Sequence, residues 1–98
     1  MDLSNVEWPS TWSACDNRVL EDELKREVAS DHSIYGEEIQ VVAQRGDRDD
    51  VLYYLTSKNA FALVHLTWSS KTENPPWPST KIYQTFNEFA AENFDEQE

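Results

Sequence analysis

The alternation of apolar and polar positions predicts three short strands in the middle of the chain. The first runs from Ile39 to Ala43, with Val41 between them at the same spacing. The second covers residues 51–56 and the third covers residues 60–68, and turn residues separate each run from the next. Because short alternating runs joined by turns are typical of hairpins, we expect a three-stranded antiparallel meander.

The last two predicted strands are apolar on both faces. Residues 51–55 and 61–66 carry apolar side chains at nearly every position. Strands of this kind are covered on both sides of the sheet. Two short helices do not easily cover both faces, so we expect the Trp/Pro loop, residues 68–78, to cover part of one.

Two helices flank the predicted strands. The first covers about residues 17–29 and starts at Asp16 or Asn17, either of which can cap its first amides. Its apolar stripe consists of Val19, Leu20, Leu24 and Val28. Residues 85–88, Thr-Phe-Asn-Glu, form a capping box, which predicts a second helix that begins at Phe86.

These elements predict a single α+β domain over residues 1–98, in the order α-β-β-β-α. We expect the helices on one face of the sheet. The other face would be covered by the Trp/Pro loop and by an extended arm, residues 1–15, that is anchored by its two tryptophans. The acidic tail, residues 95–98, is expected to fray.

The charge of the chain limits its partners. Nineteen acidic residues against eight basic ones give a formal charge of −11, which would repel a phosphate backbone or an anionic membrane surface. We therefore expect no direct nucleic-acid or membrane binding. The charge favours solubility, and it also suits a surface that attracts a basic protein.

The compartment follows from the cysteine content and the amino terminus. Cys15 is the single cysteine, so no intrachain disulfide forms and an oxidising compartment is not implied. The first twelve residues lack the basic and apolar regions of a signal peptide. No apolar stretch approaches the roughly twenty residues of a membrane span. We expect a cytoplasmic protein.

His65 is the titratable side chain in the middle of the third predicted strand. Beside a carboxylate such as Glu73 or Asp50, it could serve as a general base, a pH-sensitive switch or a ligand contact. The alternative interpretation is a buried imidazole whose hydrogen bond orders the adjacent loop.

Aromatic residues near the Trp/Pro loop form the candidate binding surface. Trp68 and Trp77, with the neighbouring prolines, could hold a sugar face, a cation or an extended peptide, and Tyr35 is expected to belong with them. The alternative interpretation is that these rings cover the sheet as part of the core.

Other chemistries lack the residues that they need. The chain has no G-x-S-x-G motif, and its two glycines leave no phosphate-binding loop. Two histidines and one cysteine without close spacing do not make a closed zinc site. We therefore expect no catalytic constellation, no cofactor and no metal.

Three segments resemble a group of small bacterial proteins without assigned function. They are His32–Gly36 (HSIYG), Asp49–Tyr53 (DDVLY) and Val64–Trp68 (VHLTW), followed by Glu73 and Trp77-Pro78. This chain departs from the pattern in the turn at residues 57–59, where it has Ser-Lys-Asn and the group more often has Asp-Gly. The resemblance implies a bacterial cytoplasmic origin and marks His65, Trp68, Glu73 and Trp77, but it brings no reaction and no ligand.

Taken together, these observations favour a small acidic interaction module that binds another protein, for example an inhibitor of a basic toxin or nuclease. The alternative is a small-ligand binding protein or enzyme that uses His65, Glu73 and Asp50 beneath Trp68 and Trp77. A third possibility is a subunit that completes a larger assembly. The oligomeric state does not follow from the sequence.

Overall fold

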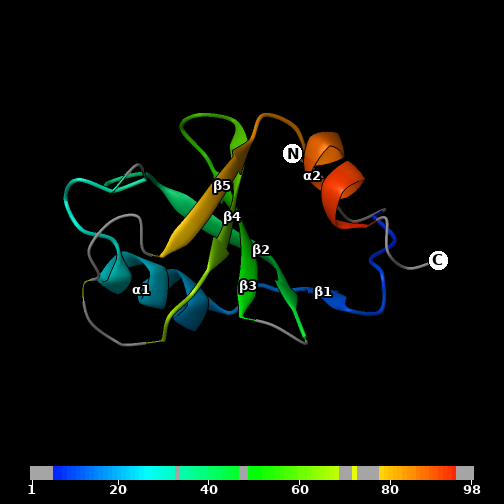
Figure 1. Cartoon of the computed structure of the whole chain (residues 1–98), viewed down its shortest axis with the longest axis horizontal. Coiled ribbons are helices and arrows are strands. Elements are labelled where there is room, and N and C mark those ends of the chain that lie inside the picture. The colour runs from blue at the N-terminus through cyan, green and yellow to red at the C-terminus, as the bar shows by residue number, and fades with distance from the viewer. Residues whose placement is uncertain (1–5, 33, 47–48, 69–71, 73–77, 95–98) are drawn as a thin grey trace.

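The computed structural model describes residues 6–32, 34–46, 49–68, 72 and 78–94. Within these residues, five strands form one antiparallel sheet in the order β1-β2-β3-β4-β5, and two helices pack on it (Figure 1). In chain order the elements are β1 (Trp12–Ala14), α1 (Arg18–Glu27), β2 (Ile39–Arg45), β3 (Asp50–Leu55), β4 (Ala60–His65), β5 (Ser79–Tyr83) and α2 (Phe86–Asn93). No helix in this part of the chain is long and apolar enough to cross a membrane.

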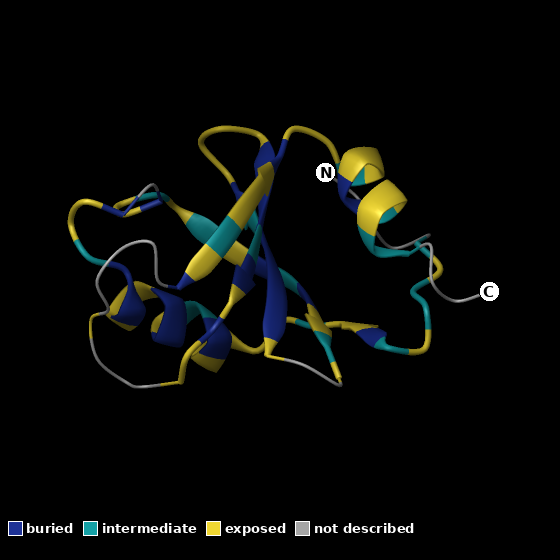
Figure 2. Ribbon diagram, viewed as in Figure 1, coloured by how far each residue is buried: buried dark blue, intermediate teal, exposed yellow. Residues whose placement is uncertain are grey.

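The predicted α+β class is confirmed, and β2, β3 and β4 form the expected meander, but the sheet is wider than predicted. The order α-β-β-β-α is wrong because β1 precedes the first helix and β5 precedes the second. β1 pairs with β2, and β5 pairs with β4. Both are short edge strands. β1 has three residues, and β5 is polar and largely exposed, so neither has the longer run of apolar residues that made β2, β3 and β4 predictable (Figure 2).

Each face of the sheet carries its own apolar core. The core on the α1 face consists of Leu20, Leu24, Val28, Ile34, Val41, Val51, Tyr53, Leu55, Ala62, Val64 and Leu66. The core on the α2 face consists of Trp12, Ala43, Leu52, Phe61, Tyr83 and Phe89. The expectation that both helices lie on one face is therefore wrong. β3 and β4 are apolar on both sides, and each helix covers one side (Figure 1).

The amino-terminal arm packs on the same face as α2. The Trp8 ring centroid lies 5.6 Å from that of Phe86 and 5.6 Å from that of Phe94, in edge-on contacts. Trp12 meets Phe89 edge-on at 5.3 Å. Edge-to-face pairs at such distances add to the stabilisation that comes from burial. The arm thus lies beside a helix rather than opposite both helices. The predicted cover by the Trp/Pro loop falls largely on residues outside those described.

A bulge in β2 divides its apolar residues between the two cores. The pairing with β3 shifts register between Val41 and Ala43. Simple alternation would place these two side chains on one face, as the sequence pattern suggests. Because of the extra residue, Val41 belongs to the core on the α1 face and Ala43 to the core on the α2 face. One strand therefore supplies both layers.

Candidate functional site

Asp50 and His65 form a polar pair at one end of the sheet. Asp50 begins β3, His65 ends β4, and the two are direct cross-strand neighbours. Nδ1 of His65 lies 2.8 Å from Oδ1 of Asp50. Since a carboxylate oxygen only accepts, Nδ1 carries a proton. Asp50 is buried, whereas the His65 side chain is 47% exposed. The pair therefore presents an oriented imidazole at the surface.

Ser79 extends this pair into a row across three strands. It is the cross-strand neighbour of His65 on β5, and it is exposed. Directly paired residues of antiparallel strands point to the same face, with Cβ atoms about 5 Å apart. A carboxylate, an imidazole and a hydroxyl thus follow one another on the face that carries α2. Sequence reasoning missed Ser79, because no nucleophile motif surrounds it and β5 itself was not predicted.

Trp68 combines an unusual backbone conformation with an exposed ring. Its φ is 57°, in a region that bulky residues rarely adopt, and the residue is 43% exposed. The backbone N–H groups of Thr67 and Trp68 donate to the two carboxylate oxygens of Glu27, at 3.0 and 2.8 Å. These bonds draw the backbone towards α1, so β4 ends at His65 and not at Trp68 as predicted.

Glu27 belongs to a pair of buried acids on α1. Glu23 and Glu27 are both 0% exposed. Arg26 donates to Glu23 at 2.7 Å, and Glu27 follows Glu23 by four residues on the same face of the helix. Burial, and next the bond to Glu23, raise the pKa of Glu27 from 4.5 to about 7, although the two backbone amides that it accepts act in the opposite direction. Glu27 is therefore a buried proton site, because its carboxyl group has a pKa near neutral pH.

The sequence did contain a signal for these acids. The predicted stripe includes Val19, which the structure exposes, whereas Glu23 and Glu27 are buried. They lie three and seven residues after Leu20, which is the spacing of one helix face. The sequence analysis did not predict their burial, because acidic residues on a helix are usually exposed to solvent.

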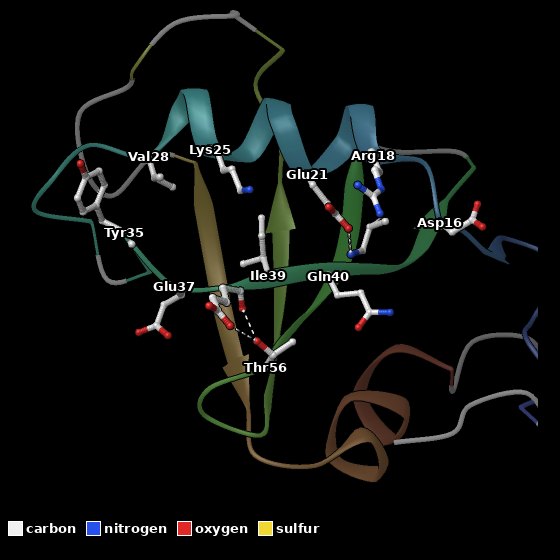
Figure 3. A pocket seen from close by; sticks show the side chains of 13 residues that line it. Asp16, Arg18, Glu21, Lys25, Val28, Tyr35, Glu37, Ile39, Gln40 and Thr56 are labelled. Atoms are coloured by element: carbon white, nitrogen blue, oxygen red, sulfur yellow. Dashed lines mark hydrogen bonds between the residues drawn. The ribbon is translucent and has the colours of Figure 1, made fainter.

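A pocket of about 910 Å³ lies between α1 and β2 (Figure 3). Its charged lining residues are Asp16, Arg18, Glu21, Lys25, Glu37 and Glu38. Glu21 accepts the backbone N–H of Val41 at 2.9 Å, which ties the helix to the strand. Glu37 bonds to Lys58 at 3.1 Å, and the hydrogen bonds from Lys58 and Ser57 lower the pKa of Glu37. The carboxylates of the pocket are thus largely engaged in holding the fold.

The structure separates the predicted site residues. Tyr35 is 55% exposed and lines the pocket beside α1, which none of Asp50, His65 and Trp68 lines. Asp50 and His65 meet, as the pairing hypothesis requires, and Trp68 contacts Glu27 instead. The predicted Glu73 and Trp77 lie outside the described residues.

His32, the second histidine, has a structural position. It is buried, and its Nε2–H donates to the carbonyl of Pro78 at 3.0 Å. The Nδ1 accepts the N–H of Ile34 at 3.3 Å. One nitrogen donates and the other accepts, so this geometry fits a neutral imidazole. His32 therefore fixes the chain just before β5 against the connection that follows α1.

Comparisons of the chain with protein-family models, curated proteins and solved structures found no match in any of the three. In the described part of the chain, no group of three or more histidine, cysteine, aspartate or glutamate residues is placed to hold a metal ion. A functional proposal for this protein therefore rests on its own residues and their geometry.

Proposed function

We propose that the protein is an interaction module that binds a positively charged partner protein through Trp68. The observation that carries this proposal is the conformation of Trp68, whose exposed ring sits on a left-handed backbone fixed by a buried carboxylate. A sparsely populated backbone conformation costs of order 1–3 kcal/mol and is found preferentially at functional sites. The fold holds this residue in place without burying its ring, which supports a role outside the core.

The expected chemistry of the partner follows from charge. An indole face attracts the cationic side chains of arginine and lysine at short range. The formal charge of −11 adds a longer-range attraction that salt screens. The sequence adds Glu73 and Trp77 as further candidate binding residues, and both lie outside the described residues. An inhibitor of a basic toxin or nuclease is one concrete form of such a module.

The test is capture of partners from the source cell by the full chain at low and high salt, with identification by mass spectrometry. We expect a stoichiometric basic protein that is retained at low salt and lost at high salt. Trp68→Ala should abolish capture. Ile82→Ala is the matched control, because Ile82 is also a large exposed apolar residue (40%) but lies on β5.

Two results would overturn the proposal. The first is an absence of any stoichiometric partner for a bait that stays folded. The second is a partner that Trp68→Ala captures as well as the unmodified chain does. Attraction between exposed charges weakens as ionic strength rises. If salt did not change the amount of partner captured, the proposed electrostatic contribution to binding would be wrong.

A second candidate function rests on the row formed by Asp50, His65 and Ser79. His65 has a buried carboxylate on Nδ1, which is the arrangement that orients a general base. In acyl transfer, Ser79 Oγ would attack an ester carbonyl carbon while its proton passes to Nε2 of His65. The leaving alcohol would take that proton, and water would then release the acyl group from Ser79.

Hydrolysis of an activated ester by the full chain tests this candidate. We expect turnover above the solution rate that Ser79→Ala and His65→Asn each abolish, with Asp50→Asn causing a smaller loss. Ser57→Ala is the control, since Ser57 is an exposed serine at the far end of the same strands. Equal rates for the unmodified chain and for Ser79→Ala would exclude the candidate.

A further inference from the structure

We infer that the buried Glu23–Glu27 pair is a proton-operated hold on Trp68. With one proton between the two carboxyl groups, the pair holds the backbone amides of Thr67 and Trp68, and loss of that proton loosens residues 67–68 from α1. The inference rests on the proposed function and deepens it, because it makes the presentation of Trp68 to a partner depend on pH.

Glu23 and Glu27 are neighbours on one face of α1, because they are four residues apart. Two ionised carboxylates can only accept hydrogen bonds and repel each other, so neighbouring buried acids favour a state in which one of them keeps its proton, and Glu23 accordingly raises the pKa of Glu27. With that proton in place the pair carries a single negative charge. Arg26 compensates for this charge, and the two backbone N–H groups satisfy the oxygens of Glu27.

The two carboxyl groups are also buried. Both side chains are 0% exposed, so a second negative charge would appear beside the first in a site with little access to water. Two like charges in a shared buried site favour any movement that separates them. The Glu27 side chain can separate by giving up its contacts to residues 67–68, which lie at the surface. The pKa of Glu27, raised to about 7, places this change near neutral pH.

Groups on the neighbouring elements do not replace the missing proton. Tyr53 on β3 donates its hydroxyl proton to the carbonyl of Leu20 at 2.6 Å, and burial, followed by the charge of Glu27, raises its pKa. Tyr53 therefore stays neutral throughout the neutral range. Glu21 on α1 is an acid that accepts from Val41, and it adds negative charge rather than compensation.

The test is an NMR titration of the full chain between about pH 5 and pH 9, a window that brackets the Glu27 transition. It follows the amide resonances of Thr67 and Trp68, the Trp68 indole N–H and the side-chain carboxyl carbon of Glu27. We expect all four signals to shift together with a midpoint at about 7. Above the midpoint, the two amides should exchange with solvent faster than the ordinary dependence of exchange on pH predicts.

Three variants assign the transition. Glu27→Gln should remove it from the amides, and Glu23→Gln should lower its midpoint, because the neighbouring carboxyl group is then neutral. His65→Asn should leave the midpoint unchanged, which excludes the nearby imidazole as its source. A transition that persists in Glu27→Gln would overturn the inference.

The carboxyl carbon of Glu27 in the unmodified chain decides the matter even if a variant fails to fold. Titration of this carbon near the ordinary value of 4.5 overturns the inference. Partner capture is scored separately, at pH values on either side of the midpoint. A clear titration with an empty pull-down would reject the proposed function and support the proton site, whereas capture without the titration would do the reverse.

Discussion

The Glu27 carboxylate accepts the backbone N–H of Trp68 at 2.8 Å across 41 residues of sequence. Through this bond and its partner at Thr67, helix α1 determines where β4 ends and how the chain leaves the sheet. The same bond joins a buried proton site to an exposed indole. The proposed contact surface is therefore positioned by a polar contact rather than by the apolar core.

The backbone of Trp68 gives the first prediction. Glycine adopts a positive φ without steric cost, whereas alanine does not, so Trp68→Gly should be more stable than Trp68→Ala by about 1 kcal/mol. Both variants should stay folded, because Trp68 is 43% exposed and does not belong to either core. Chemical denaturation of the two variants measures the difference.

The control for this comparison is a position with ordinary backbone geometry. At Ile82 in β5, the glycine variant should be the less stable of the two, since glycine weakens a strand. Equal stability of Trp68→Gly and Trp68→Ala would mean that the left-handed conformation is not maintained in solution.

The raised pKa of Glu27 predicts that the protein loses stability as pH rises through neutrality. The pKa of Glu27 is about 7 in the folded chain, whereas an unfolded chain has the ordinary glutamate value of 4.5. Between pH 4.5 and pH 7 the folded chain therefore binds more protons than the unfolded chain. Stability therefore falls as pH increases across this window and levels off above it. The loss should be about 2 kcal/mol, which allows for partial relaxation of the site.

Denaturation midpoints at several pH values between about 5 and 8 measure this loss. Glu27→Gln should flatten the dependence, because the variant has no proton to lose at this position. Glu88→Gln is the control, since Glu88 is an exposed acid at the start of α2, and it should retain the slope. A stability that rises with pH over the same window would contradict the assignment.

The strong local signals of the sequence agree with the structure, and the weak ones do not. The capping box predicted a helix from Phe86, and the Thr85 side chain accepts from the N–H of Glu88 as expected. The meander was predictable because β3 and β4 are rich in apolar residues. β5 was not, because an edge strand exposes polar residues and its identity depends on pairing with β4.

The arrangement of the site was only partly predictable. The Asp50–His65 contact could be anticipated, since Asp50 immediately precedes the second predicted strand and a hairpin brings it beside the third, which carries His65. The contact between Glu27 and Trp68 could not, because it joins the last residue of α1 to a residue that lies 41 positions later and beyond the end of β4. Helix periodicity places Glu27 on the buried face, but only the tertiary structure shows which amides it binds.

The amino-terminal cap of α2 gives a further prediction. Thr85→Ala removes the acceptor for the N–H of Glu88 and should cost about 1 kcal/mol of stability. Asn87→Ala, two positions later and exposed, should instead be neutral or slightly stabilising, because alanine favours a helix. Thermal or chemical unfolding of the two variants distinguishes them, and equal destabilisation would argue against the cap.

The two cores make Phe89 the residue on which the carboxy-terminal helix depends. Phe89 is 0% exposed, and its ring meets Trp12 at 5.3 Å, Tyr83 at 5.7 Å and Phe94 at 5.6 Å. Phe89→Ala should cost about 3–5 kcal/mol, a large part of the stability of a small domain.

Because α2 and the arm share this core, the variant should release both from the sheet together. Hydrogen exchange should then show amides of α2 and β1 losing protection at the same denaturant concentration, while α1 on the opposite face keeps its protection longer. Loss of protection in α2 alone would mean that the arm is held by contacts other than those with Phe89.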